Sequence, residues 1–319
     1  MKDQSQIAVL IPCHNEQATI ARVVDDFRAQ LPEAVIYVFD NCCTDATASI
    51  ADGHGAVVVK EPRLGKGNVV EAMLDEIEAD FFVMVDGDDT YPASSVHELL
   101  KPVLNGDADM SVGARLGEHD DKSFRPLHVA GNNLVRGLIN KIFRANLTDI
   151  MSGYRAFNRS VVRRIPVVSS GFEVETELTI QMLYYRLKIV EVAVPYRGRP
   201  EGSFSKLSTF RDGARVLWKI FSLVRAFKPL TFFGGIGLIL FFFGVLAGIP
   251  PIYGFIQTHG QKVEHFPLAI LATGLMILST GSVFMGVLLH AINWRFKELH
   301  NVMTRGKDSL AARRLRGQP

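Results

Sequence analysis

Apolar and polar positions alternate along the first part of the chain in a way that predicts both strands and helices. Four short runs are almost uniformly apolar, at 6–12, 34–40, 56–61 and 81–86. Helix candidates lie between them, at 15–31, 44–55 and 65–77. Near-uniform apolar strands that alternate with helices predict an α/β fold, with a mainly parallel sheet covered on both faces. Thr44 is expected to cap the second helix.

Two much longer apolar stretches follow near the C-terminal end, at 229–256 and 267–292. Each contains about 20 or more residues, which matches a hydrocarbon layer of ~30 Å at 1.5 Å per residue. We therefore expect two transmembrane helices, at about 229–253 and 267–292, rather than two buried helices of a soluble domain. Residues 207–228 carry separate apolar and basic stripes. They predict an amphipathic helix in the membrane interface, or alternatively a surface helix packed on the domain.

Charge divides the chain at the same place. The net charge is only +2, but residues 1–205 carry 21 Lys and Arg against 29 Asp and Glu, whereas residues 206–319 carry 14 against 4. Basic residues flank the apolar pair on its outer sides, so the positive-inside rule places the N-terminal domain and both termini in the cytoplasm. The N-terminus does not resemble a signal peptide, which agrees with this orientation. We predict an integral protein of the plasma or inner membrane. Its predicted partner is the lipid bilayer, and no nucleic acid is expected to bind.

Acidic residues follow the predicted strands where each one ends. The first strand leads into 12–16, the second ends in Asp40, and the fourth ends in Asp86, Asp88 and Asp89. The carboxyl ends of parallel strands meet at one edge of a sheet, where ligands bind. Crowded carboxylates favour a hard divalent cation such as Mg²⁺ or Mn²⁺, which also bridges to phosphates. The alternative is a solvated acidic turn before a helix.

Eight short motifs, in this order, carry a resemblance to a known family. They are IPCHNE at 11–16, DNCCTDAT at 40–47, GKGNVV at 65–70, VDGDD at 85–89, GAR at 113–115, SGYRAF at 152–157, FEVETEL at 172–178 and RPEGSFSKLSTFRDG at 199–213. The first five resemble the GT-A glycosyltransferases of family 2. The last three resemble its polyprenyl-phosphate sugar transferases, the dolichyl-phosphate mannose synthase group. The resemblance implies a Rossmann-like GT-A catalytic domain at 1–206, the interfacial helix at 207–228, the membrane hairpin within 229–294 and a basic cytoplasmic tail at 295–319.

The resemblance implies a site for a nucleotide sugar linked to UDP or GDP. In this family the residues matched by Pro12, Glu16 and Asp40 contact the base and ribose. Lys66 lies in the Gly-Lys-Gly turn and is expected to hold the base or the diphosphate. Cys43 stands where Ser is common, and a thiol is the weaker hydrogen-bonding group.

The resemblance also implies a metal site. Asp86 and Asp88 match the Asp-x-Asp motif, in which a divalent ion, Mg²⁺ or Mn²⁺, neutralises the donor diphosphate. Asp86 is therefore also part of the implied donor site. No role is carried over for Asp89. Thr90 occupies the place where some relatives have Gln as an extra ligand.

On the acceptor side the resemblance implies cations. Arg115, Arg199, Ser205 and Lys206 match positions around the acceptor phosphate and the diphosphate. Arg and Lys suit phosphate oxygens, and Arg binds two of them at once. The alternative for 199–206 is a polar linker before the membrane helix.

Three glutamates lie in the motif FEVETEL. Glu175 and Glu177 fall where family members orient the sugar or brace the acceptor loop, and the sequence leaves open which of them, or Glu173, does so. Glu191, in contrast, is interpreted as ordinary surface charge.

The implied activity is the inverting transfer of one sugar from a nucleotide sugar to a polyprenyl phosphate at the cytoplasmic membrane face. The implied catalytic residues are Asp86, Asp88, Arg115, Arg199 and Lys206. Homo-oligomers are implied by resemblance alone. One alternative is a membrane glycosyltransferase with a glycolipid or polysaccharide acceptor, although the Gln-x-x-Arg-Trp segment of polymerising members is missing. Another is a non-catalytic membrane component with a transferase-like domain.

Overall fold

The computed structural model describes residues 6–115, 126–198, 200, 218, 221–263 and 265–315. The chain divides into two compact units, 1–220 and 221–319. The predicted interfacial helix at 207–228 lies mostly outside the described residues, although 221–227 are helical.

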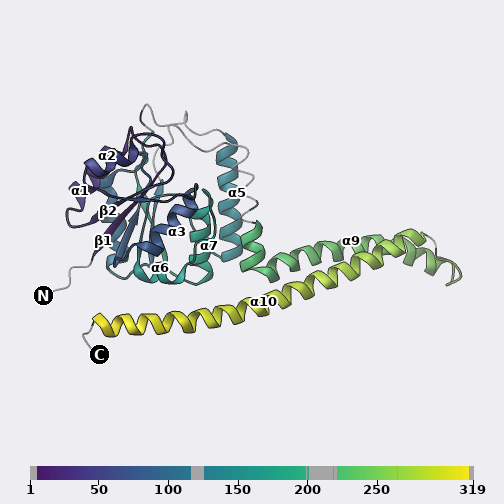
Figure 1. The fold of residues 1–319 in the computed structure, drawn as a ribbon. Coiled ribbons are helices and arrows are strands. Elements are labelled where there is room, and N and C mark those ends of the chain that lie inside the picture. The colour runs from purple at the N-terminus through teal and green to yellow at the C-terminus, as the bar shows by residue number, and fades with distance from the viewer. Residues whose placement is uncertain are drawn as a thin grey trace. The chain divides into compact units, whose positions relative to one another are not determined.

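The first unit is built on a seven-stranded sheet with the strand order β3-β2-β1-β4-β6-β5-β7. Figure 1 shows this sheet with helices packed around it. The strands are β1 (Ile7–Cys13), β2 (Val35–Asp40), β3 (Val57–Lys60), β4 (Phe81–Met84), β5 (Met110–Arg115), β6 (Arg155–Asn158) and β7 (Ile189–Val194). Only β6 runs antiparallel to its neighbours, β4 and β5. The predicted α/β fold with a mainly parallel sheet is confirmed, and the four predicted strands are β1 to β4.

Helices cover both faces of this sheet. They are α1 (Ile20–Gln30), α2 (Thr47–Gly53), α3 (Lys66–Glu76), the short 3₁₀ helix η1 (Ala93–Ser95), α4 (Val96–Leu104), α5 (Pro126–Phe143), α6 (Arg159–Arg164) and α7 (Val174–Tyr184). α1, α2 and α4 enclose one apolar cluster against the sheet, and α3, α6 and α7 enclose the other. Successive strand residues point to opposite faces, so β1 gives Val9 and Ile11 to the first cluster and Ala8 and Leu10 to the second.

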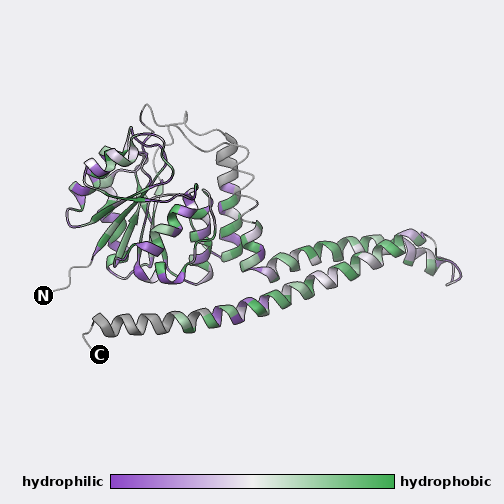
Figure 2. Ribbon diagram, viewed as in Figure 1, coloured by the Kyte–Doolittle hydropathy of each residue, from purple (hydrophilic) through white to green (hydrophobic). Residues whose placement is uncertain are grey.

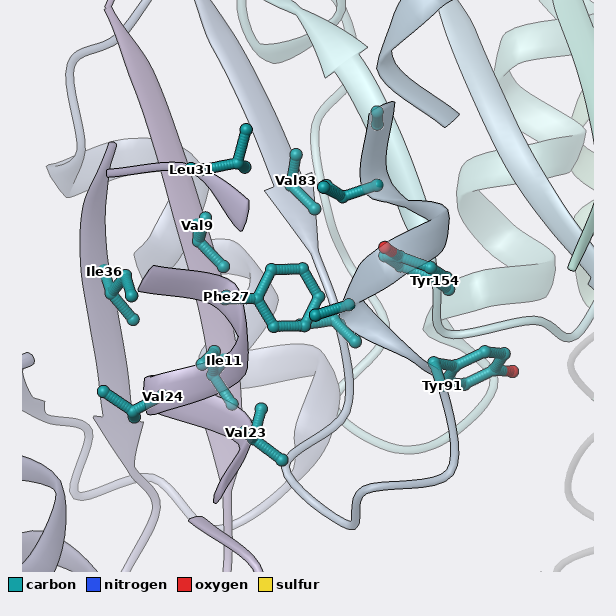
Figure 3. Close-up of a cluster of buried hydrophobic side chains, with 14 of the residues drawn as sticks. Val9, Ile11, Val23, Val24, Phe27, Leu31, Ile36, Val83, Tyr91 and Tyr154 are labelled. Atoms are coloured by element: carbon teal, nitrogen blue, oxygen red, sulfur yellow. The ribbon is translucent and has the colours of Figure 1, made fainter. Parts of the chain in front are cut away.

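Helix α1 shows how the sequence pattern produces this packing. Its buried residues Ile20, Val23, Val24 and Phe27 follow the 3.6-residue period of one helix face. The Phe27 ring lies over β1 and meets the ring of Tyr154 edge-on, at 6.1 Å between centroids (Figure 3).

Replacing Phe27 with alanine is expected to remove a large part of the first apolar cluster. A buried Phe→Ala change costs about 3–5 kcal/mol of unfolding free energy. For a domain of this size that lowers Tm by roughly 6–20 °C, measurable by thermal unfolding of the full chain in detergent. Val57→Ala, at an exposed strand position, is the control. A Phe27→Ala protein with the wild-type Tm would contradict this packing.

The start of α2 corrects one expectation. The helix begins at Thr47, and Thr44 does not cap it. Asp45 does this instead, because its Oδ1 accepts hydrogen bonds from the backbone N (3.0 Å) and Oγ1 (2.5 Å) of Thr47. Thr44 is engaged elsewhere, since its backbone N donates to Oδ1 of Asn15 at 2.7 Å.

The second unit contains two long helices, α9 (Pro229–Gln257) and α10 (Phe266–Leu315). Both are long and apolar enough to cross a membrane, and Figure 2 shows hydrophobic residues along α9 and the first part of α10. Hydroxyls join the two helices: Oγ of Ser279 donates to the carbonyl of Gly237, and Oγ of Ser282 to that of Phe233, both at 2.8 Å. Small and hydroxyl residues of this kind are common where apolar helices pair. α10 continues as a helix into the predicted tail.

Candidate active site

The loops that follow β1, β2 and β4 are tied together at the carboxyl edge of the sheet. The backbone N of Asn41 donates to the carbonyl of Cys13 at 2.9 Å. The backbone N of Glu16 donates to Oγ1 of Thr47 at 2.8 Å, and Oγ1 of Thr19 donates to the carbonyl of Gly87 at 2.6 Å. Pro12, Glu16 and Asp40, the predicted nucleoside contacts, therefore lie on adjacent strand ends of one rim.

Cys43, at the position where serine is common in the family, takes part in hydrogen bonds with both neighbouring loops. Its Sγ accepts from the backbone N of Asn15 at 3.2 Å and donates to the carbonyl of Cys13 at 3.5 Å. Its own backbone N donates to Oδ1 of Asp40 at 2.8 Å. Burial and the hydrogen bond to Asp40 raise the pKa of Cys43 to about 11, so the group is a neutral thiol near pH 7. The thiol thus joins the first two loops of the rim.

The Gly-Lys-Gly turn at the start of α3 is fixed by close backbone contact. The backbone N of Gly67 donates to the carbonyl of Ser170 at 3.1 Å. A Cβ on Gly67 would lie 1.8 Å from the carbonyl oxygen of Ser169, so only glycine allows this approach. Lys66 is thereby held between two loops.

Asn41 is a site residue that the sequence did not reveal. Its Nδ2 donates to the carbonyls of Arg63 (2.8 Å) and Glu61 (3.0 Å), and its Oδ1 accepts from the backbone N of Gly65 (2.7 Å). One buried carboxamide therefore connects the end of β2 to the turn that carries Lys66. Its place directly after a strand is the only signal in the sequence, because its partners are 20 to 24 residues away.

Lys66 joins two of the predicted carboxylates. Its Nζ lies 2.5 Å from Oδ1 of Asp86 and 2.5 Å from Oε1 of Glu175. The side chains of Lys66 and Glu175 are only 11% and 6% exposed, whereas that of Asp86 is 27% exposed. Burial opposes the charge on Lys66, but the two carboxylates outweigh it and raise the pKa of the ammonium. Asp86 therefore faces the accessible side of a buried ionic cluster.

Asp88 and Asp89 differ in surroundings. Oδ1 of Asp88 accepts from the hydroxyl of Thr90 at 2.6 Å and from its backbone N at 3.3 Å. Asp89 adopts a left-handed conformation (φ 56°), and its Oδ2 lies 3.0 Å from Nη1 of Arg22. Asp88 thus lies within the turn beside Asp86, and Asp89 pairs with the neighbouring helix α1.

Asp86 and Asp88 supply carboxylate oxygens, the ligands that a hard divalent cation prefers. Asp86 is partly exposed at the rim and already pairs with Lys66, and Asp88 is buried. Across the described parts of the chain, no three His, Cys, Asp or Glu side chains form a complete metal site. A cation held by Asp86 and Asp88 would take its further ligands from water and from substrate phosphate, as Mg²⁺ commonly does.

Gly153 lies directly against Asp86. A Cβ at this position would stand 2.4 Å from Oδ2 of Asp86. Gly153→Ala is expected to displace the Asp86 carboxylate and weaken its ion pair with Lys66, so Tm should fall as well. Because misplacement by about 1 Å can cost up to a hundredfold in rate, transfer should fall roughly tenfold to a hundredfold, measured as kcat/KM beside Tm. Gly53→Ala is the matched control, since nothing lies within 4 Å of a Cβ there. Equal rates in the two variants would contradict this contact.

Arg115 occupies a separate part of the rim, at the end of β5. Its Nε and Nη2 form a two-point ion pair with Asp149, at 2.6 and 2.8 Å. Its guanidinium also lies over the ring of Tyr196, 5.4 Å from the centroid. Burial opposes ionisation of both groups, but their pairing lowers the pKa of Asp149 and raises that of Arg115. Arg115 is therefore a fixed, permanently charged guanidinium.

The glutamates of α7 have different surroundings. Glu175 contacts Lys66. Glu177 instead accepts backbone N–H groups from Ser169 (2.7 Å) and Val168 (3.3 Å), and so braces the loop on which the Lys66 turn rests. Of these two glutamates, Glu175 therefore belongs to the ionic cluster with Lys66 and Asp86.

Arg155 organises this region from within the core. It is fully buried, and its guanidinium donates to the carbonyls of Ile150 (2.7 Å), Ser152 (2.9 Å) and Glu175 (2.9 Å). Burial lowers its pKa from the ordinary value. Arg155 thereby joins the first turn of α7 to the loop that carries Asp149.

The structure changes the interpretation of Glu191. Glu191 is not ordinary surface charge, because its carboxylate accepts hydrogen bonds from the backbone of Thr148 and Asp149. The long sequence separation hid this contact. Arg199, Ser205 and Lys206, the other predicted acceptor contacts, lie outside the described residues and stay predictions.

Comparison with known proteins decides the family. A sequence model of glycosyl transferase family 2 matches residues 8–165. Glycosyltransferase AglJ of Haloferax volcanii is 30% identical over 289 residues, which cover 90% of this chain and 94% of that protein. The chain belongs to glycosyl transferase family 2. Protein RfbJ of Shigella flexneri is 49% identical to this glycosyltransferase over 122 residues, which cover 38% of this chain and 95% of that protein. The low-salt glycan biosynthesis hexosyltransferase Agl6 of Haloferax volcanii is 34% identical over 246 residues, which cover 76% of this chain and 58% of that protein.

Solved structures agree on the fold of this family 2 glycosyltransferase. Glucosyl-3-phosphoglycerate synthase of Mycobacterium tuberculosis, in complex with Mn²⁺, UDP-glucose and phosphoglyceric acid, superimposes with a TM-score of 0.55 at 24% identity. The match covers 70% of this chain and 80% of that one. The predicted GT-A fold is confirmed.

Proposed function

We propose that this glycosyltransferase moves one sugar from a UDP- or GDP-linked donor onto a polyprenyl phosphate at a membrane. The observation that carries the proposal is the joint presence of two features in one chain. One is the strand-end cluster of Asp86, Asp88 and Lys66, and the other is a pair of helices apolar enough to span a membrane. A lipid phosphate suits both, because it is an anionic acceptor that stays in the bilayer.

The donor half of the proposal has independent support. Structures of the glucosyl-3-phosphoglycerate synthase contain UDP-glucose and Mn²⁺ in the same fold. In this chain Asp86 and Asp88 would hold Mg²⁺ or Mn²⁺, which when bound neutralises the donor diphosphate and so assists departure of the nucleotide. Lys66 adds a fixed cation beside Asp86, and the rim of Pro12, Glu16 and Asp40 would seat the nucleoside.

The transfer itself needs little proton chemistry. An oxygen of the acceptor phosphate attacks the anomeric carbon from the face opposite the leaving group and forms the new C–O bond. The old bond to the diphosphate breaks, and its electron pair leaves on the diphosphate oxygen, so the anomeric configuration inverts. The phosphate oxygen is already anionic near neutral pH, so the chain needs cations rather than a strong base. Arg115, Arg199, Ser205 and Lys206 would hold the two phosphate groups.

The membrane arrangement is part of the proposal. α9 and α10 would span the bilayer as a hairpin, with the glycosyltransferase domain and both termini in the cytoplasm of a plasma or inner membrane. Residues 207–228 would lie in the interface, and homo-oligomers are expected. The similarity to Agl6, a low-salt glycan biosynthesis hexosyltransferase, supports a role in the synthesis of glycans.

The test uses the purified full chain in detergent. A panel of radiolabelled UDP- and GDP-sugars is supplied with farnesyl phosphate and either Mn²⁺ or Mg²⁺, and label in the organic phase is counted. The expected result is lipid-linked label from at least one donor, abolished by a chelator. No organic-phase label from any donor, or label that a chelator leaves unchanged, would contradict the proposal.

A further inference from the structure

Glu191, in β7, is a carboxylate that lies outside the cluster of Lys66, Asp86 and Glu175 and holds the backbone of Thr148 and Asp149. Its Oε1 accepts from the backbone N of Thr148 at 2.7 Å and from that of Asp149 at 2.8 Å. Its Oε2 accepts from the hydroxyl and the backbone N of Thr148, at 2.9 and 2.8 Å. A carboxylate that receives two successive backbone N–H groups and a hydroxyl fixes both the position and the direction of that short segment.

The segment held in this way carries the partner of Arg115. Asp149 follows Thr148, and its carboxylate binds Nε and Nη2 of Arg115 at 2.6 and 2.8 Å. It also accepts from the backbone N–H groups of Arg115 and Met151, both at 3.2 Å. Two-point pairing between Arg and a carboxylate depends on orientation, because both oxygens must lie in the plane of the guanidinium. A small shift of the Asp149 backbone therefore turns the guanidinium.

The sheet places Glu191 on the strand beside the one that ends in Arg115. β5 and β7 are parallel neighbours, with Val112 opposite Glu191 and Arg115 opposite Val194. The carboxylate of Glu191 thus projects from the strand beside the one that ends in Arg115. β7 also leads to Tyr196, whose ring lies against the Arg115 guanidinium, and to the backbone N of Arg197, which donates to the carbonyl of Thr90 at 2.9 Å. β7 thus holds the ion-pair partner of Arg115 through Glu191, and the segment that follows β7 places Tyr196 against the guanidinium.

We propose that Glu191 is a positioning residue for the acceptor, which acts through Asp149 to aim Arg115 at the acceptor phosphate. The inference rests on the proposed function, because it takes Arg115 to bind that phosphate. Glu191 touches neither the donor cluster of Lys66 and Asp86 nor, in the proposal, either substrate. Its removal should therefore weaken acceptor binding selectively, whereas a general loss of structure would weaken both sides.

The test measures both sides separately in Glu191→Ala and Glu191→Gln. Isothermal titration of the full chain in detergent gives Kd for farnesyl phosphate, and in separate runs for UDP and GDP with Mn²⁺. Glu191→Ala is expected to raise the Kd for farnesyl phosphate about tenfold. The Kd for whichever of UDP and GDP binds more tightly should stay within twofold of the wild-type value. Glu191→Gln keeps one carbonyl oxygen for the backbone N–H groups and should show a smaller effect. Glu78→Ala is the control, because Glu78 is 89% exposed and, among the residues that the structure describes, pairs with Arg159 alone.

A double-mutant cycle tests the route through Asp149. Glu191→Ala should have no further effect on the farnesyl phosphate Kd in an Asp149→Ala background, since residues that act in series are not additive. Three results would overturn this inference but not the proposed acceptor. They are equal effects of Glu191→Ala in both backgrounds, an unchanged Kd for farnesyl phosphate, and equal losses of affinity for nucleotide and farnesyl phosphate. Wild-type protein that binds no farnesyl phosphate would overturn the proposed acceptor and this inference with it.

Discussion

Asp88→Asn is expected to reduce sugar transfer on the order of a hundredfold or more, the usual effect of removing one group that stabilises developing charge. Asparagine keeps the size of the side chain and one oxygen to accept from Thr90, so the turn should stay folded. What it loses is the negative charge that would bind the divalent ion beside Asp86. The measurement is kcat/KM for the donor over a range of Mn²⁺ concentrations.

Asp89→Asn is the matched control for this prediction. It removes one charge from the adjacent position, and asparagine tolerates the left-handed backbone that Asp89 adopts. Asp89 itself is only 6% exposed, but its partner Arg22 is 66% exposed, and asparagine keeps a side-chain oxygen to accept from Arg22. We expect at most a few-fold change in rate. Equal losses in the two variants would mean that the cluster acts only through its total charge.

Lys66→Met is expected to be the second most damaging change, and it should affect stability as well as rate. It leaves Glu175 and Asp86 close together without their shared cation. Breaking a buried ion pair from one side commonly costs about 3–5 kcal/mol, because the remaining charge is uncompensated. Transfer should fall about a hundredfold, since a cation next to the donor diphosphate is lost. Tm and kcat/KM of the full chain measure the two effects.

A second substitution separates stability from catalysis. Glu175→Gln added to Lys66→Met removes one of the unpaired carboxylates, so most of the lost Tm should return while transfer stays low. Lys101→Met, at an exposed position on α4, controls for the general loss of a lysine. Recovery of full activity in the double variant would show that Lys66 stabilises the fold but does not contribute to transfer.

The elements that the sequence predicted share a local signal. β1 to β4 are short runs of apolar residues, and α1 repeats its apolar residues at the helical period. α9 and α10 could be predicted because about 20 apolar residues in succession are rare in soluble domains. The acidic turn after β4 could be placed at the binding edge because parallel strands end together.

Other features depended on contacts between distant residues. Asn41, Asp149 and Glu191 are ordinary polar residues in sequence, and their roles arise from partners between 20 and 43 residues away. Gly153 lies in the motif SGYRAF, and it makes room for Asp86 at a separation of 67 positions along the chain. Local patterns carry no information about such pairs, so only the folded chain reveals them.

One comparison separates a prenyl phosphate acceptor from a glycolipid acceptor. The full chain in detergent receives Mn²⁺ and the nucleotide sugar that supports transfer, with undecaprenyl phosphate, undecaprenol or a prenyl-diphosphate-linked sugar as acceptor at equal concentration. We expect organic-phase label with undecaprenyl phosphate and none with the alcohol, which lacks the anionic nucleophile and the group that Arg115 would bind. Label on the prenyl-diphosphate-linked sugar without label on undecaprenyl phosphate would contradict this expectation and identify a glycolipid acceptor.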